Sequence, residues 1–298
     1  MLKEKFIEYI RYEKRFSTHT ITAYQHDLQQ FAGFMQERYS QSDISIAGHS
    51  MIRSWLVDLL SKGITPRSVN RKLSTLKSFY RFCLRQGFIH ENPMAKVISP
   101  KSSKGLPVFL EKEPMEKLFS RQGFSGGFEG TRDRMILILF YTTGMRLSEL
   151  CELRINSLDL SKQTIKVTGK RNKERIIPAG GYLCDQLEIY IKERDKIFLK
   201  EQSDKSSDHL FITKKGKPVY QRLVYDLVHQ YLSGVSSLEK LSPHVLRHTF
   251  ATQMLNEGAD LNAIKEILGH ANLAATQVYT HNTIEKLKSV YNQSHPRA

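Results

Sequence analysis

The sequence of 298 residues is poor in cysteine, in tryptophan and in long hydrophobic runs. Its three cysteines, Cys83, Cys151 and Cys184, are odd in number and fit no metal-binding spacing, so they are expected to be thiols in a reducing cytoplasm. No apolar run approaches the roughly 20 residues of a membrane span. The opening MLKEKFIEYIRYEK is charged and amphipathic and lacks the core of a signal peptide. We therefore expect no membrane segment.

Acidic residues are also scarce relative to basic ones. The chain has 30 Asp and Glu against 45 Lys and Arg, a formal net charge of +15, while its 40% hydrophobic content is ordinary for a globular protein. A surface this basic indicates a polyanionic partner, either nucleic acid or an anionic membrane.

One stretch rich in Ser, Lys, Gly and Pro, ISPKSSKGLP at residues 98–107, predicts an interdomain linker. We expect an N-terminal domain over residues 1–98, a linker over 99–107 and a second domain over 108–298. Residues 1–105 carry 17 Lys and Arg against 8 Asp and Glu, so the smaller part is the more basic one per residue.

The N-terminal part has helical patterns throughout. STHTITAYQHDLQQFAGFM offers Ser17 or Thr18 as an N-cap, and TPRSVNRKLSTLKSFYRFCLRQG begins with Pro66 and ends before Gly87. On the second helix an apolar face opposes a stripe of arginines and small hydroxyls. A solvated polar face would explain such a stripe as well as a DNA contact does, but the overall charge favours DNA. The stripe arginines are Arg67, Arg71, Arg81 and Arg85.

The second part has a mixed pattern. RDRMILILFYTTGMRLSELCEL predicts an apolar helix that breaks at Thr143–Gly144 and restarts at Leu147 or Ser148. QTIKVTGKRNKERIIPAG predicts two strands around a turn at 169–172, and SPHVLRHTFATQMLNEG and DLNAIKEILGH predict two further helices. The expected fold is mainly α with a small antiparallel β-sheet.

Polar residues that could carry chemistry gather in the second part. His244 and Arg247 in SPHVLRH share a helix face, and an arginine beside a histidine suits a phosphate. The His244–His248 spacing also fits a zinc pair, but Arg247 on that face would repel a dication and no carboxylate completes the site. We therefore expect no metal and no cofactor. A further cation, Arg146, would start a helix, where it opposes the helix dipole unless an anion lies beside it.

The hairpin turn is basic at Lys170, Arg171 and Lys173, which alone is typical of a solvated tip. Tyr279, in LGHANLAATQVYTHN, is either a half-buried aromatic or a nucleophile. A free phenol has a pKa of about 10, so a nucleophilic tyrosine needs neighbours that help it ionise.

Together these segments resemble the tyrosine site-specific recombinases of the phage integrase family, and within it the XerC/XerD branch, over essentially the full length. The resemblance lies in TGMRLSEL, GKRNKER, SPHVLRH, LGH and VYTH in this order, and it extends from ITAYQHDLQQF to the terminal HPRA. The sequence departs from it at Arg171, where GKGNK is common, and at LAATQ, where LSTTQ is common. It carries features of both XerC and XerD.

The resemblance implies two domains, an N-terminal helical, SAM-like domain that binds DNA and a C-terminal α+β catalytic domain. It implies that Tyr279 attacks a DNA phosphodiester to form a 3′-phosphotyrosine. His244 would accept the phenolic proton, Lys170 would protonate the leaving oxygen, and His270 would hydrogen-bond the phosphate. Arg146 and Arg247 would hold the charge of the transition state. The basic stripe, Arg171 and Lys173 would contact DNA.

The resemblance also implies partners and a cellular task. Four protomers would act on two dif-like sites, with a paralogous Xer recombinase and an FtsK-type translocase, to resolve chromosome dimers during cell division in the cytoplasm, on the nucleoid. The alternatives are a mobile-element integrase, a relaxing topoisomerase and a catalytically silent DNA-binding protein. The terminal helix, with Leu287 and Tyr291 on its apolar side, would fold back on its own domain or, as the resemblance suggests, dock on a neighbouring protomer.

Overall fold

The structure, a computed structural model, forms two compact units, Met1–Gly105 and Leu106–Ala298, each with its own hydrophobic core. The residues that it describes are 2–101, 108–120, 123–169, 173–201, 208–238, 241–269 and 281–297. Among them, no helix is long and apolar enough to cross a membrane.

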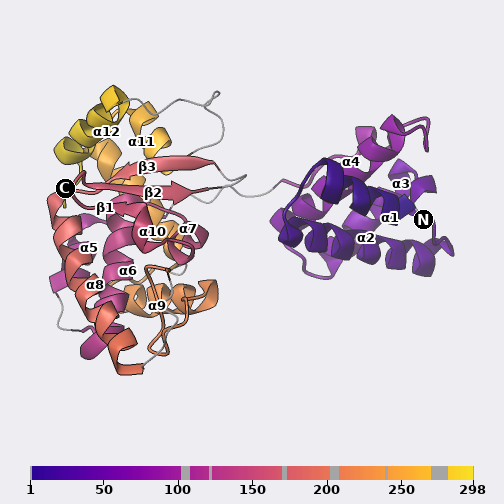
Figure 1. Ribbon diagram of the computed structural model, residues 1–298. Helices are drawn as coiled ribbons and strands as arrows, with labels where there is room; N and C mark the ends of the chain where they lie inside the picture. The colour runs from indigo at the N-terminus through magenta and orange to yellow at the C-terminus, as the bar shows by residue number, and fades with distance from the viewer. Residues whose placement is uncertain are drawn as a thin grey trace. The chain divides into compact units, whose positions relative to one another are not determined.

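The N-terminal unit is all-helical over its described residues, as predicted (Figure 1). Ser17 caps α2 by accepting a hydrogen bond from the Thr20 amide, and Pro66 occupies the first turn of α4 behind the N-cap Thr65. The α-helices are α1 (Leu2–Glu8), α2 (Thr18–Tyr39), α3 (His49–Ser61) and α4 (Pro66–Arg85). Short turns of other helix types cover Tyr9–Glu13, Ile44–Ile46 and Pro93–Lys96.

Helix α4 is the centre of this unit. Its predicted apolar face is buried at Val69, Leu73, Leu76, Tyr80 and Cys83, and the Tyr80 hydroxyl donates to the Ile44 carbonyl at 2.6 Å. Asn70 Nδ2 donates to the carbonyl oxygen of Pro100 at 2.9 Å. The described start of the predicted linker therefore lies against α4.

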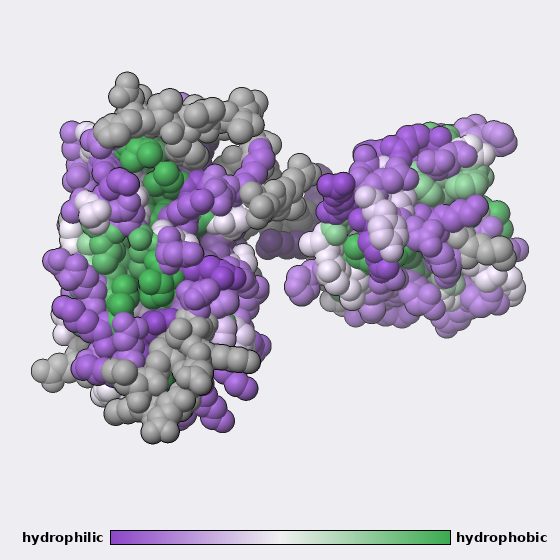
Figure 2. All heavy atoms as spheres, in the orientation of Figure 1, coloured by the Kyte–Doolittle hydropathy of each residue, from purple (hydrophilic) through white to green (hydrophobic). Residues whose placement is uncertain are grey.

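The second unit surrounds one buried helix. Every residue of α6 (Gly127–Thr143) from Met135 to its end is buried, and α8, α9 and α10 pack on it. The other helices are α5 (Lys112–Ser120), α7 (Leu147–Cys151), α8 (Gly181–Glu201), α9 (Gln221–Ser233), α10 (Pro243–Asn256), α11 (Leu261–Leu268) and α12 (His281–Ser294), with a 3₁₀ turn over Ile155–Ser157. In the view of Figure 2 hydrophobic residues gather in a band on this unit, whereas hydrophilic residues dominate the visible face of the N-terminal unit.

The small sheet is antiparallel, with strand order β1-β2-β3. The predicted hairpin consists of β2 (Thr164–Thr168) and β3 (Glu174–Pro178), in register with Val167 opposite Arg175, and the sequence did not indicate the two-residue strand β1 (Leu158–Asp159). Helices α11 and α12 lie beside β3 (Figure 1). The sheet thus brings the hairpin next to the end of α11.

Two glycines end helices close to each other. Gly144 caps α6 with φ of 58°, and a Cβ there would lie 2.6 Å from the ring of Phe250. Gly269 ends α11 with φ of 64°. Both positions require the left-handed backbone that glycine adopts without strain. The chain restarts as α7 at Leu147, so the predicted break at Thr143–Gly144 is confirmed.

In the single chain, helix α12 packs on its own domain, which is the arrangement that the resemblance did not favour. Leu287 and Tyr291 are buried in the core of the second unit, and His295 lies in a cage of aromatic rings that includes Tyr141 and Phe250. The Arg297 guanidinium lies over the ring of Phe119, 4.7 Å from its centroid. The tail is therefore anchored in cis at its far end.

Candidate active site

Arg146 lies at the start of α7 and is paired with a carboxylate. Its backbone N–H donates to Glu149 Oε2 at 2.8 Å, and its Nη1 donates to Glu149 Oε1 at 2.7 Å. Glu149 is the third residue of the helix, where a glutamate commonly satisfies the N-cap amide. Glu149 thus supplies part of the negative charge that is expected beside Arg146 at the start of a helix. The Arg146 side chain remains 33% exposed.

Arg247 is buried in α10 and is held by two carbonyl groups. Its Nη1 donates to Gly144 O at 2.6 Å and its Nη2 donates to Leu268 O at 2.7 Å. Burial, together with the nearby charges of Arg146 and Arg175, lowers its pKa to about 10, so it stays cationic at neutral pH. Both acceptors lie where a helix ends, and cations are stabilised there by the helix dipole.

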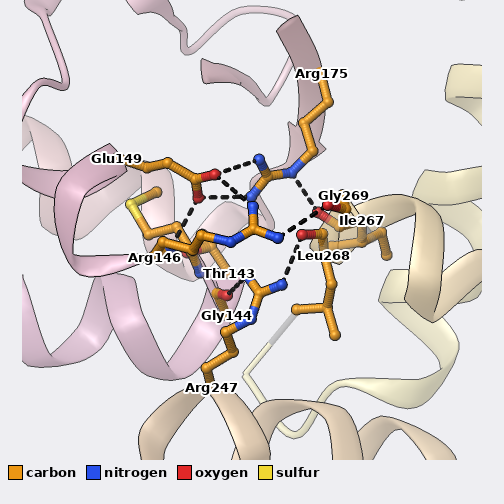
Figure 3. Close-up of polar contacts among 10 residues, drawn as sticks. Thr143, Gly144, Arg146, Glu149, Arg175, Arg247, Ile267, Leu268 and Gly269 are labelled. Atoms are coloured by element: carbon orange, nitrogen blue, oxygen red, sulfur yellow. Dashed lines mark hydrogen bonds and ion pairs between the residues drawn. The ribbon is translucent and has the colours of Figure 1, made fainter. Parts of the chain in front are cut away.

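Three consecutive carbonyl groups at the end of α11 each accept from a different arginine (Figure 3). The pairs are Ile267 O with Arg175 Nε at 2.7 Å, Leu268 O with Arg247 Nη2 at 2.7 Å, and Gly269 O with Arg146 Nη2 at 2.9 Å. One turn of backbone therefore gathers three guanidinium groups from β3, α10 and the start of α7. The next residue in the chain is His270.

The sequence analysis missed two members of this cluster, Glu149 and Arg175. Both are buried, and Arg175 Nη1 and Nη2 donate to Glu149 Oε1 and Oε2, each at 2.8 Å. Burial alone would raise the pKa of Glu149, but the hydrogen bonds and charge of Arg175, with those of Arg146, lower it to about 2. An available signal was the alternation of β3, which places Arg175 on the same face as the apolar Ile177.

His244 lies on the same helix as Arg247, as predicted, and it keeps an exposed surface. The protein that covers the rest of the imidazole, together with the positive charges of Arg247, His248 and Arg146, lowers its pKa below the ordinary histidine value. A neutral imidazole at neutral pH can accept a proton. Among the described residues, no group of three or more His, Cys, Asp or Glu side chains is placed to hold a metal ion.

Several predicted site residues lie outside the part of the chain that the structure describes, namely Lys170, Arg171, His270 and Tyr279. The ends of the predicted turn are seen, because the Gly169 amide donates to the Lys173 carbonyl at 2.7 Å. Lys173 is exposed and directly precedes β3. The structure therefore brings together Arg146, His244 and Arg247 and does not test the other three catalytic assignments.

The four stripe arginines are exposed on α4, but they are not equivalent. Arg71 is paired with an acid of another helix, because its Nη1 and Nη2 donate to both oxygens of the buried Asp27 on α2, at 2.6 and 2.8 Å. The guanidinium of Arg85 lies 4.7 Å from the ring centroid of Tyr9. Within the described residues, Arg67 and Arg81 make no hydrogen bond or ion pair, so they are the stripe members most available to a phosphate.

Asp27 also accepts from Lys72 Nζ at 3.1 Å and from the Thr75 hydroxyl at 2.9 Å. Burial raises its pKa, but the hydrogen bonds from Arg71, Lys72 and Thr75 outweigh burial, so the pKa lies below the ordinary value. The lowered pKa of Asp27 stabilises the folded state at pH values above the unfolded-state pKa of this carboxyl. This stabilisation is lost as the pH falls through its folded-state pKa. Arg71 thus fastens α4 to α2 as well as lying in the stripe.

Two family models match the sequence. Residues 109–286 match the phage integrase family, and residues 4–87 match the phage integrase N-terminal SAM-like domain. The tyrosine recombinase XerC of Halalkalibacterium halodurans is 40% identical over 294 residues, which cover 98% of this chain and 96% of the relative. The tyrosine recombinase XerC of Bacillus subtilis is 38% identical over 293 residues, which cover 98% and 95%.

Among solved structures, the XerH site-specific recombinase bound to palindromic difH substrate, in a post-cleavage complex, has a TM-score of 0.72 at 20% identity, over 99% of this chain and 82% of that one. The Tn1549 transposon integrase in complex with transposon right end DNA has a TM-score of 0.71 at 20% identity, over 96% and 97%. At these identities the likeness shows the fold. Because two family patterns and near-full-length relatives cover this sequence, the chain belongs to the phage integrase family of tyrosine recombinases.

Proposed function

We propose that the protein is a Xer-type site-specific recombinase that cuts and rejoins double-stranded DNA through a 3′-phosphotyrosine intermediate. The observation that carries this proposal is the gathering of Arg146 and Arg247 on the backbone turn directly before His270, with His244 one helical turn from Arg247. Each arginine keeps further guanidinium N–H groups beyond those that bind carbonyls, and two such cations suit the non-bridging oxygens of a phosphate.

In the proposed reaction, the Tyr279 oxygen attacks the phosphorus of a phosphodiester. The bond between phosphorus and the 5′ oxygen breaks, the 3′ phosphate becomes bound to Tyr279, and His244 accepts the phenolic proton. Lys170 gives a proton to the departing 5′ oxygen, and His270 donates to the phosphate. Negative charge grows on the non-bridging oxygens, where Arg146 and Arg247 stabilise it. Attack by another 5′-hydroxyl reverses these steps and rejoins the strands.

The lowered pKa of His244 supports its role, since a proton acceptor must be neutral in the working pH range. The roles of Lys170, His270 and Tyr279 rest on their order and context in the sequence. Nothing in this scheme requires a divalent ion, because the protein's own cations serve the phosphate.

We further propose the division of labour between the two units. Residues 1–98 would bind DNA, with Arg67 and Arg81 on phosphates, and residues 108–298 would form the catalytic domain, joined by residues 99–107. Arg171 and Lys173 would add contacts from the hairpin. Arg67 and Arg81 are exposed and have no partner in the described part of the chain, which supports the first of these contacts.

The near-full-length relatives named XerC favour a Xer role over a mobile-element integrase. The proposed task is the resolution of chromosome dimers at a dif-like site, on the nucleoid in the cytoplasm. Four protomers would act on two sites, with a paralogous Xer recombinase and an FtsK-type translocase as partners.

A nicked suicide substrate that carries a dif-like site tests the activity. Cleavage beside the nick releases a short strand and traps the covalent adduct, which denaturing electrophoresis detects in EDTA as well as in buffer. Tyr279→Phe should bind the same DNA and trap none. An adduct formed by the phenylalanine variant would refute the assignment of Tyr279, and DNA binding without an adduct by the unaltered protein would indicate a catalytically silent DNA-binding protein.

A further inference from the structure

Arg175 is the most enclosed member of the arginine cluster and the one that connects its parts. It is 5% exposed. It reaches from β3 to the carboxylate of Glu149 in α7 with two nitrogens and to the Ile267 carbonyl at the end of α11 with the third (Figure 3). A single side chain thus ties the hairpin, the segment of Arg146 and the segment that leads to His270.

The contact with Glu149 bears on Arg146. Each oxygen of the Glu149 carboxylate accepts one hydrogen bond from Arg175 and one from Arg146. Glu149 is 4% exposed, so its charge must be compensated by groups of the protein. If Arg146 were the only cation beside it, that compensation would cancel the charge that Arg146 offers to a phosphate. With Arg175 present, the Glu149 charge is balanced and Arg146 and Arg247 keep theirs.

The contact with α11 bears on the backbone before His270. A Cβ on Gly269 would lie 2.9 Å from Arg175 Cδ, so the Arg175 side chain packs directly beneath the left-handed turn at Gly269. The Ile267 carbonyl that Arg175 binds is two residues earlier in the same turn. Arg175 therefore shapes the turn whose Leu268 and Gly269 carbonyls hold Arg247 and Arg146.

We propose that Arg175 is a positioning residue for strand cleavage: through Glu149 and the turn at Ile267–Gly269 it fixes Arg146 and Arg247 and keeps their charge available to the scissile phosphate. This inference rests on the proposed roles of those two arginines. Arg175 itself would not touch the DNA.

The test compares Arg175→Met and Arg175→Lys with the unaltered protein in single-turnover cleavage of the nicked substrate, with DNA affinity measured separately. Arg175→Met should cleave about a hundredfold more slowly at unchanged affinity, because the loss concerns the transition state. Arg175→Lys keeps the positive charge but not the forked guanidinium, so its cleavage rate should lie between those of Arg175→Met and the unaltered protein. Arg194→Met is the matched control, since Arg194 is equally buried in the same domain and donates to the His209 carbonyl away from the site. It should cleave at the unaltered rate while folded.

A pH profile separates positioning from general stability. Without Arg175, Glu149 remains buried and loses two hydrogen bonds, so its pKa should rise into the working range. Its protonation would then remove the negative charge that cancels Arg146, so the cleavage rate of Arg175→Met should fall less steeply with decreasing pH than that of the unaltered protein. The double variant Arg175→Met/Glu149→Gln has no group to titrate there, so this difference in slope should vanish.

Unaltered rates and pH profiles in folded Arg175→Met or Arg175→Lys would overturn the proposal. The proposal would also be overturned if the rate losses of Arg175→Met and Glu149→Gln multiplied in the double variant, because residues that act through one another are not independent. Failure of the unaltered protein to trap any adduct would instead contradict the proposed function, so the two failures can be told apart.

Discussion

Arg247 Nη1 donates a 2.6 Å hydrogen bond to the carbonyl oxygen of Gly144, the residue that ends α6. Because Nη2 of the same guanidinium binds Leu268 O at the end of α11, Arg247 lies between the carboxyl ends of two helices. Its cation is therefore held in place before any DNA is bound, which is the condition for effective stabilisation of a transition state.

Arg247→Ala should lower the rate of covalent cleavage by about 10²- to 10³-fold, as removal of a preorganised donor does. DNA affinity should change much less. The substitution also leaves two buried carbonyl groups without a donor, which costs about 1–3 kcal/mol for each in the free energy of unfolding. Rates should accordingly be measured well below the melting temperature. An alanine variant that cleaves at the unaltered rate would remove Arg247 from the reaction.

The pH dependence of cleavage should report His244. Its pKa is lowered by burial and by Arg247, His248 and Arg146, so the acid limb of the rate profile should lie below the ordinary histidine value of about 6.5. His248→Gln removes one of the opposing charges and should move that limb to higher pH. An acid limb above the ordinary value, or one that His248→Gln leaves in place, would contradict the assignment of His244 as proton acceptor.

Local features of the chain were well predicted because their causes lie within a few residues. Ser17 and Pro66 start their helices, Gly144 interrupts the long apolar pattern, and the alternation around 164–178 forms the hairpin. The side-chain cap of Ser17, the ring of Pro66 and the missing Cβ of Gly144 each act on the adjacent backbone. Strand β1 has two residues and carries too short a pattern to be seen.

The contacts that the sequence did not predict join residues far apart in the chain. Asp27 and Arg71 are 44 positions apart, and Glu149 and Arg175 are 26 positions apart. A carboxylate and a guanidinium on two separate amphipathic segments look like solvated charges until the fold buries them together. Such pairs follow from packing, which periodicity along one segment does not specify.

The stripe on α4 can be tested with Arg67 and Arg81, which have no hydrogen-bond or ion-pair partner among the described residues. Arg67→Ala/Arg81→Ala should weaken DNA binding and lower the slope of log affinity against log salt by about two, since each phosphate contact releases roughly one counterion. Arg38→Ala/Arg53→Ala removes the same charge from exposed positions on α2 and α3 and should leave the slope nearly unchanged. Equal slopes for the two double variants would return the stripe to the interpretation of a solvated face.

The cis packing of α12 revises what truncation of the tail should do. If the tail docked on a neighbouring protomer, as the resemblance suggests, deleting 283–298 would leave a folded monomer that fails to assemble. The structure instead buries Leu287, Tyr291 and His295 of this segment in the catalytic unit. Deletion would expose the rings that surround them, and the shortened protein should be unstable. Single substitutions are therefore the better probe of the tail.

Tyr291→Ala should lower the free energy of unfolding by about 3–5 kcal/mol, as loss of a fully buried aromatic side chain does. Gln293→Ala is the control, since Gln293 is exposed on the same helix. A contact within one chain gives an unfolding midpoint that does not change with protein concentration, whereas a tail docked on a neighbour gives a midpoint that rises with it. Chemical unfolding of the DNA-free protein at several concentrations should show no change in midpoint. A midpoint that rises with concentration, and a Tyr291→Ala variant that abolishes this rise, would show that free molecules exchange their tails.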